Sequence, residues 1–376
     1  MHAGSLPLEQ KRGLRIDWLL IAATLIMLVI GLMSLYSEGD TRDHGAVFKK
    51  QIVFTFIGIV PFGIFATVPP KFWQRISWWL YGVNVLALLA VRFVGSEKKG
   101  AERWIEFGPM QFQPSEMAKL LTIITLSAFF AYRQDAIRSF STFALSLLHI
   151  SIPLGLILMQ PHLGAALVIL VSWFAISLVA GVPIKFLGGT VAAFACFIGL
   201  MVAVPSLPGL VLQPYQLDRL YGMIQQDDTG KSWQTDRAQI AFANGSVMGT
   251  GYLNGTQKAG HFIPEQNNDF IFTVVGEEGG LIGCTLVLLA FGFFFFRVWL
   301  VMFLASELYY RMLAAGVFAA LFFHMFVNIG MVLKVLPVVG LWLPFLSSGG
   351  TALWLCLACV GLLLSIRRRE APVLFS

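Results

Sequence analysis

Charged residues are scarce in this sequence. Of its 376 residues, 57% are hydrophobic and only 12% are charged, whereas a soluble domain carries about 25% charged residues. So few charges cannot cover the surface of a soluble globular protein, and the apolar content excludes a disordered chain. A membrane β-barrel is disfavoured, because its strands alternate apolar and polar residues instead of running apolar for ~20 residues. We therefore expect a polytopic α-helical membrane protein.

Cysteines, repeats and low-complexity tracts are also few or absent. Cys356 and Cys359 form a C-x-x-C pair on one face of an apolar run, but a structural zinc site needs four ligands, so we expect packing or lipid-facing thiols. The first apolar run, Trp18–Ser37, is too long for a signal peptide and lacks a cleavage site, which indicates a retained span. With no separate polar domain, residues 1–376 form a single integral membrane domain.

One helical span needs ~20 apolar residues, and the chain offers ten candidates. The predicted spans are Trp18–Ser37, Gln51–Val68, Ile76–Val91, Leu120–Tyr132, Ser139–Met159, Leu163–Val182, Phe186–Val204, Ile271–Phe296, Met312–Leu333 and Thr351–Ile366. The fourth run is short, so its helix is expected to begin before Leu120. The prediction is thus an all-α fold with ten transmembrane helices and both termini on one side.

The loops on the side of the termini have about twice the density of Lys and Arg of those on the other side, which makes the termini cytoplasmic by the positive-inside rule. The net charge of +6 then reflects cytoplasmic loops, and no nucleic acid is expected as a partner. One large extracytoplasmic loop, about 205–269, lies between spans seven and eight. Two further loops face outward, Gly95–Ser115 and Lys334–Gly350.

Asp269 ends the large loop directly before the apolar residues Phe270, Ile271 and Phe272. Partial desolvation at such a boundary raises the pKa of a carboxylate and makes it a better proton acceptor. The alternative is a helix N-cap, a common role for Asp before an apolar run. Glu277 follows eight residues later. If the helix is regular, Glu277 and Asp269 share one face, and the two carboxylates are candidates for a proton or metal relay. The alternative is that Glu277 belongs to a polar helix start outside the hydrocarbon.

Glu116 and Lys119 are three residues apart, a spacing that lets them pair on one helix face. Such a pair either supports an anionic substrate or a catalytic carboxylate, or is a plain buried ion pair. Arg103 lies in the same outward loop. Arg219, in the large loop, suits a phosphate, although most loop arginines are merely solvated.

A Pro- and Gly-rich break, Leu336–Thr351, contains Ser347. Irregular backbone at membrane depth is tolerated only where it is buried or lines a cavity. Its backbone amides are candidates to hold an anion, and the alternative is an ordinary re-entrant turn.

Eight motifs in one order carry a family resemblance. They are Glu102-Arg103-Trp104-Ile105, Phe112-Gln113-Pro114-Ser115-Glu116-x-x-Lys119, Gln160-Pro161-x-Leu163-Gly164, Gly251-Tyr252-Leu253-Asn254-Gly255-Thr256-Gln257, Phe262-Ile263-Pro264-Glu265-Gln266-x-x-Asp269-Phe270-Ile271-Phe272, Gly276-Glu277-Glu278, Asn328-Ile329-Gly330-Met331 and Pro344-Phe345-x-Ser347-x-Gly349-Gly350. Together they resemble the SEDS family of bacterial peptidoglycan polymerases. The fourth and fifth are more similar to the elongation (RodA) branch than to the division (FtsW) branch.

The resemblance implies a glycosyltransferase of the bacterial inner membrane that polymerises lipid II, with undecaprenyl diphosphate as leaving group. It implies Asp269 as general base, Glu116 and Lys119 as a supporting pair, and a class B penicillin-binding protein as partner. The metal requirement stays open, although acidic loop residues leave room for Mg²⁺ or Mn²⁺. The sequence departs from the family pattern at His162, where Asp is usual.

Two other functions compete with the polymerase. A lipid II flippase would also be polytopic and recognise a diphosphate lipid, but it should show a polar route through the helices, whereas the polar residues here gather on one side. A non-catalytic scaffold of a cell-wall complex is the third hypothesis.

Overall fold

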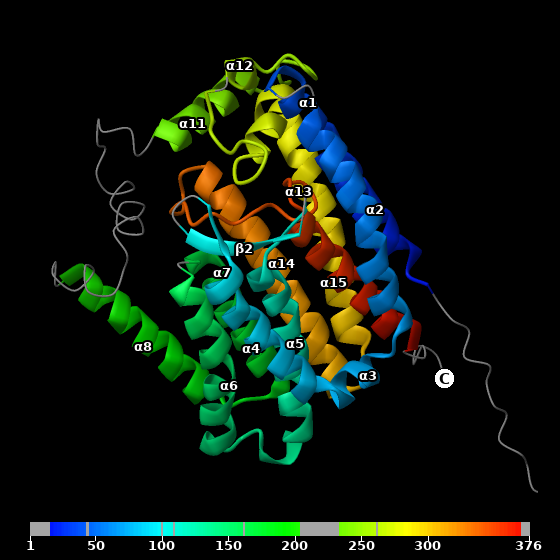
Figure 1. Ribbon diagram of the computed structural model, residues 1–376, viewed down its shortest axis with the longest axis vertical. Coiled ribbons are helices and arrows are strands. Elements are labelled where there is room, and N and C mark those ends of the chain that lie inside the picture. Colours follow the sequence, from blue (N-terminus) through cyan, green and yellow to red (C-terminus); the bar gives the residue numbers. More distant parts are fainter. Residues whose placement is uncertain are drawn as a thin grey trace, which may run out of the picture.

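The computed structural model describes residues 16–42, 45–98, 101–107, 110–160, 162–203, 233–260 and 262–369. Most of these residues are helical, and the long helices other than α8 (Ile184–Ala203) pack side by side as a bundle, from which α8 diverges (Figure 1). The long helices are α1 (Trp18–Arg42), α2 (Ala46–Thr67), α4 (Ser77–Val94), α5 (Pro114–Tyr132), α6 (Phe140–Met159), α7 (Leu163–Ala180), α8 (Ile184–Ala203), α13 (Phe272–Leu304), α14 (Leu308–Val332) and α15 (Gly350–Arg369). The shorter ones are α3 (Pro70–Arg75), η1 (Gln134–Ala136), α11 (Trp233–Gly245) and α12 (Thr256–Ala259).

Each of the ten predicted apolar segments lies on one of the long helices. Within the described ranges, eight of these helices are long and apolar enough to cross a membrane, and α4 and α8 contain the shorter apolar stretches Ser77–Phe93 and Ile184–Cys196. Helices suit this role because all their backbone groups bond within the segment. The protein is therefore a multi-pass membrane protein. The expected early start of the fourth helix is confirmed, since α5 begins at Pro114.

The all-α prediction omits a small sheet between α4 and α5. Strands β1 (Ser96–Lys98), β2 (Ala101–Phe107) and β3 (Met110–Phe112) form an antiparallel sheet in the order β1-β2-β3. Ile105 pairs with Phe112 across β2 and β3. Runs of three to seven residues are too short for a clear period-two pattern, which explains why the sequence did not reveal them.

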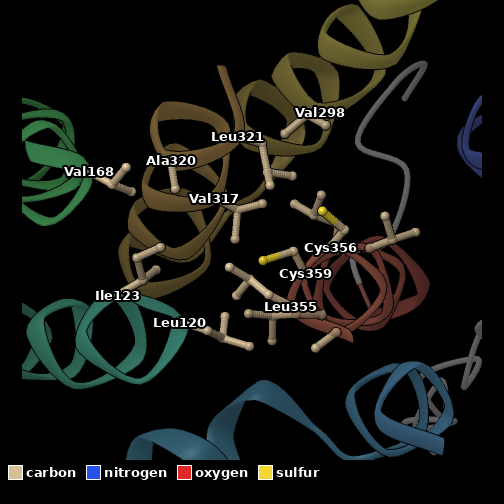
Figure 2. Close-up of a cluster of buried hydrophobic side chains, with 14 of the residues drawn as sticks. Leu120, Ile123, Val168, Val298, Val317, Ala320, Leu321, Leu355, Cys356 and Cys359 are labelled. Carbon is tan, nitrogen blue, oxygen red and sulfur yellow. The ribbon is translucent and has the colours of Figure 1, made fainter. Parts of the chain in front are cut away.

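Both cysteines of the C-x-x-C pair lie in the apolar core. Figure 2 shows Cys356 and Cys359 on α15 pointing toward Val317 and Leu321 of α14, with Leu120 of α5 close by. The two thiols are free and buried. The prediction that they serve in packing is confirmed.

Helix α13 is broken at Gly280, whose φ of 60° and ψ of −157° are not helical. The segment 246–251 fills the break with backbone hydrogen bonds. The amides of Thr250 and Gly251 donate to the carbonyls of Glu277 and Glu278 (2.9 and 3.1 Å), and two amides beyond the break donate back to Ser246 and Val247. The break thus leaves these backbone groups satisfied, as burial requires. Figure 1 shows α11 and α12 at the end of the bundle where α13 begins.

Gly280→Ala is expected to destabilise the protein. A Cβ there would lie against the amide of Gly249 and 2.7 Å from the carbonyl of Val247, at a positive φ, and strain of this kind costs about 1–3 kcal/mol. Gly292→Ala in the same helix is the control, because a Cβ there has nothing within 4 Å. Thermal unfolding in detergent should show a lower Tm for the first variant only. An equal Tm for both variants would contradict the account of the break.

Candidate functional site

Asp269 lies in a run of turns, 264–271, directly before α13. The helix begins at Phe272 with Ile271 as its N-cap, so the N-cap alternative for Asp269 is wrong. The regular helical face shared by Asp269 and Glu277 is also wrong, because Asp269 precedes the helix. Its side chain is half-buried, and its amide donates to the carbonyl of Glu265 (3.1 Å).

The backbone of Asp269 is held by α14. The side-chain amide of Asn328 donates to the carbonyl of Asp269 (2.8 Å) and to the carbonyl of Leu341 (2.6 Å). Because Asn328 is itself buried, one rigid side chain joins the Asp269 turn to the break between α14 and α15.

Ser347, in the irregular segment between α14 and α15, contacts the same turn. Its hydroxyl donates to the carbonyl of Asn268 (2.6 Å), and the amide of Ser348 donates to the carbonyl of Asn267 (2.8 Å). The structure thus brings Ser347 next to Asp269. The amides of Leu343, Ser348 and Gly349 all bond to protein acceptors, so the predicted anion site on free backbone amides is wrong for these three. The Ser348 amide holds the turn directly, whereas those of Leu343 and Gly349 bind the side chains of Ser347 and Gln51.

The predicted pairing of Glu116 with Lys119 is confirmed in the first turns of α5. Lys119 Nζ donates to both carboxylate oxygens, at 2.8 and 2.9 Å, and both side chains are almost fully buried. The indole Nε1 of Trp342 donates to Glu116 Oε2 (2.9 Å), and His324 Nε2 lies 2.9 Å from Lys119 Nζ. Buried charges need such complete pairing, because an ion removed from water is costly.

Trp342 connects the ion pair to Asp269. It stands between Leu341, whose carbonyl Asn328 binds, and Leu343, whose amide donates to the Ser347 hydroxyl (2.7 Å). Two routes of three hydrogen bonds each therefore link the ion pair to the Asp269 turn. This arrangement favours a supporting role for the pair over a plain structural one.

Glu277 has a different role from the one predicted. Its Oε1 accepts from the amides of Thr256 and Gln257 (2.8 and 2.9 Å) and from the Thr256 hydroxyl, so it caps α12. The next residue, Glu278, is ion-paired with buried Lys258. These two carboxylates fasten α12 and its flanking residues to α13.

Three further predicted residues can be placed only in part. Arg103 lies in β2, but its side chain is outside what the structure describes, and Arg219 is outside the described residues altogether. His162 is the buried N-cap residue of α7. Its Nδ1 lies 3.2 Å from the Ser115 hydroxyl and 3.3 Å from Gln113 Nε2, so it binds the start of α5 next to Glu116.

Sequence reasoning gave no site role to His324 or Trp342, and it named Asn328 only within one of the eight motifs. A lone His or Asn inside an apolar run is a functional signal in membrane proteins, and it would have singled out the two residues of α14. In the part of the chain that is described, no cluster of three His, Cys, Asp or Glu could hold a metal ion. The suggested divalent cation stays a prediction, since the acidic residues of 204–232 lie outside that part.

The fold and the site define a multi-pass helical membrane protein with a buried polar site where several helices end together. Residues 13–371 match the FtsW/RodA/SpoVE family, described as cell cycle protein. The chain belongs to this family.

Two curated relatives span nearly the whole chain. Peptidoglycan glycosyltransferase MrdB of Escherichia coli K12 is 31% identical, over 93% of this chain and 93% of the relative. Stage V sporulation protein E of Bacillus subtilis is 33% identical, over 94% of this chain and 97% of the relative.

Two solved structures are similar as well. A chain from a study of polymerization and crosslinking by a peptidoglycan synthase complex has a TM-score of 0.80 and 29% identity, covering 96% of this chain and 99% of that one. The rod shape determining protein RodA of Thermus thermophilus has a TM-score of 0.69 and 26% identity, covering 95% and 98%.

Lys119→Met should destabilise the protein strongly, because it leaves the buried Glu116 carboxylate without its cation, at a cost of about 3–5 kcal/mol. The double variant Glu116→Gln with Lys119→Met should lose less than Lys119→Met alone. Lys71→Met is the control, because Lys71 forms an exposed pair with Glu307 and such pairs contribute about 0–1 kcal/mol. The Tm of each variant in detergent measures this order of stabilities. A double variant less stable than Lys119→Met would argue against a paired buried charge.

Proposed function

We propose that the protein is a peptidoglycan glycosyltransferase of the elongation branch that polymerises lipid II in the bacterial inner membrane. The observation that carries the proposal is Asp269, a half-buried carboxylate whose turn is fixed by Asn328 and Ser347. A carboxylate held this rigidly beside an apolar helix start is suited to accept a proton. Relatives named peptidoglycan glycosyltransferase support the assignment of the activity.

The reaction joins a sugar hydroxyl to an anomeric carbon. The acceptor 4-hydroxyl is a poor nucleophile, and Asp269 takes its proton as the new glycosidic bond forms. The bond from the donor's anomeric carbon to the diphosphate oxygen breaks, and undecaprenyl diphosphate leaves with the electron pair. Proton removal by a positioned base is worth about 10²–10⁴-fold in rate. A divalent cation at the diphosphate would stabilise the leaving group, and Arg103 and Arg219 are the proposed arginine contacts to the substrate.

In this proposal ten spans place both termini in the cytoplasm and the loop 205–269 outside. Hydrogen bonds already join the segments that meet at the site. Gln113 before α5 binds Thr351 of α15, and Asn328 near the end of α14 binds Asp269 before α13. The substrate's lipid tail would stay in the bilayer while its diphosphate reaches this outer end.

We further propose a class B penicillin-binding protein as the partner that supplies transpeptidase activity. The similar solved chain comes from a complex described as coordinating polymerization and crosslinking. A multi-pass polymerase that releases uncrosslinked glycan would need such a partner nearby.

The flippase is the main alternative. In the described ranges two buried ion pairs belong to the proposed outer half, Glu116 with Lys119 and Glu278 with Lys258. They sit where helices begin or end, which favours chemistry on one side over alternating access.

Asp269→Asn is expected to abolish glycan polymerisation while leaving insertion and Tm near the parent values, because the amide keeps the shape but cannot act as a base. Purified protein, with and without its penicillin-binding partner, is given labelled lipid II, and glycan length is measured on gels. We expect a fall of at least about 10²-fold. Asp236→Asn is the control, because Asp236 is an exposed carboxylate that pairs with Lys334. This variant should retain parental activity.

Two results would decide against the polymerase. Full activity of the Asp269→Asn variant would exclude Asp269 as the base. Flipping of lipid II in vesicles by the parent and by this variant alike, without polymerisation by either, would favour the transporter.

Labelling of introduced cysteines tests the proposed sidedness. Exposed Cys196 is first replaced by Ser. In spheroplasts, a membrane-impermeant maleimide should then label Met248→Cys, a highly exposed position in the outer segment, but not Lys71→Cys, an exposed position on α3. The reverse pattern would contradict cytoplasmic termini.

A further inference from the structure

The hydrogen bonds around Lys119 are complete only because of His324. A lysine ammonium has three N–H donors and no acceptor. Two of them bind the oxygens of Glu116, and the third is directed at His324 Nε2, 2.9 Å away. Both residues are buried, so the histidine supplies the acceptor that water would otherwise provide.

The same contacts fix the protonation of the His324 ring. Its Nδ1 lies 3.3 Å from the carbonyl oxygen of Trp342, which can only accept, so Nδ1 carries the hydrogen. Its Nε2 must then be unprotonated in order to accept from Lys119. A second ring proton would point at an ammonium group. His324 is therefore a neutral ring with one donor and one acceptor, each used.

We propose that His324 is a positioning residue for the transfer reaction, acting on Asp269 through Trp342. This inference rests on the proposed function. Trp342 is held at its backbone by His324 Nδ1, at its indole by Glu116 (2.9 Å), and across its face by the His324 ring, with centroids 3.9 Å apart.

The α14 helix presents two side chains to consecutive carbonyls of the break. His324 and Asn328 are four residues apart and so lie on one helix face. His324 binds the carbonyl of Trp342, while Asn328 binds that of Leu341 and that of Asp269. The amide of Leu343, one residue after Trp342, donates to the Ser347 hydroxyl, which in turn donates to the carbonyl of Asn268. By holding Trp342, the histidine therefore sets the position of this backbone segment.

A second histidine provides the matched comparison. His149 on α6 also packs against an aromatic ring, that of Tyr81, with centroids 4.3 Å apart, and also contacts a polar side chain, Thr125. It lines a small pocket on α4, α5 and α6. These contacts lie on α4 and α5, away from the break that holds the Asp269 turn, so the loss of His149 should not alter catalysis.

The test compares His324→Gln, His324→Phe and His149→Phe in the lipid II assay. Gln offers one acceptor for Lys119 and one donor for Trp342, while Phe keeps only the stacking. We expect His324→Phe to lower kcat roughly tenfold or more with KM within about threefold, since displacing a reacting group by about 1 Å costs up to 10²-fold. His324→Gln and His149→Phe should keep kcat within about threefold of the parent.

Two results would overturn the proposal. One is parental kcat in His324→Phe; the other is an equal loss in His324→Gln and His324→Phe, which would mean that the hydrogen bonds do not matter. If His324→Phe fails to insert, Trp342→Phe decides, because it removes the indole donor to Glu116 and keeps an aromatic ring at the position that faces His324. The proposal predicts a lower kcat for that variant, and full kcat would refute it.

Hydrogen exchange separates this inference from the proposed function. In His324→Phe, amides of 265–271 should exchange faster than in His324→Gln, whether or not the parent polymerises lipid II. An inactive parent with this exchange pattern would refute the proposed function but support the positioning. An active parent whose 265–271 amides exchange alike in both variants would refute the positioning alone.

Discussion

The site depends on one buried ion pair. Glu116 and Lys119 stand in the first turns of α5 with almost no exposure, where unpaired charges would be prohibitively costly. The pair is retained because every donor of the ammonium has an acceptor and the carboxylate gains an indole donor from Trp342. The ion pair thereby forms a rigid support that positions the neighbouring irregular backbone.

Two irregular segments rest against each other beside this pair. Ser347 and Ser348 of the break between α14 and α15 donate hydrogen bonds to carbonyls of the turns 264–271, and Asn328 of α14 donates to both segments. Neither segment could satisfy its backbone alone at this depth. The hydrogen bonds between the two segments hold the Asp269 carboxylate beside an apolar helix start, as the proposed chemistry requires.

Much of this architecture follows from local sequence. Apolar runs predicted the long helices, and the three-residue spacing of Glu116 and Lys119 predicted their pairing. The short sheet and the cap that Glu277 provides for α12 could not be predicted, because they depend on strand pairing and on a partner some twenty residues away. His324 and Trp342 meet Lys119 and Glu116 from more than two hundred residues along the chain, a distance over which periodicity and spacing carry no information.

The central claim is that Asp269 acts directly on the acceptor sugar. A structure of the Asp269→Asn variant with two lipid II molecules bound would measure the distance from the residue 269 side chain to the acceptor 4-hydroxyl. If Asp269 is the base, the two groups lie at hydrogen-bond distance, about 2.6–3.2 Å, or are joined by one bridging water, with the donor's anomeric carbon on the far side of that hydroxyl. An acceptor hydroxyl facing another group, with residue 269 out of reach, would contradict it.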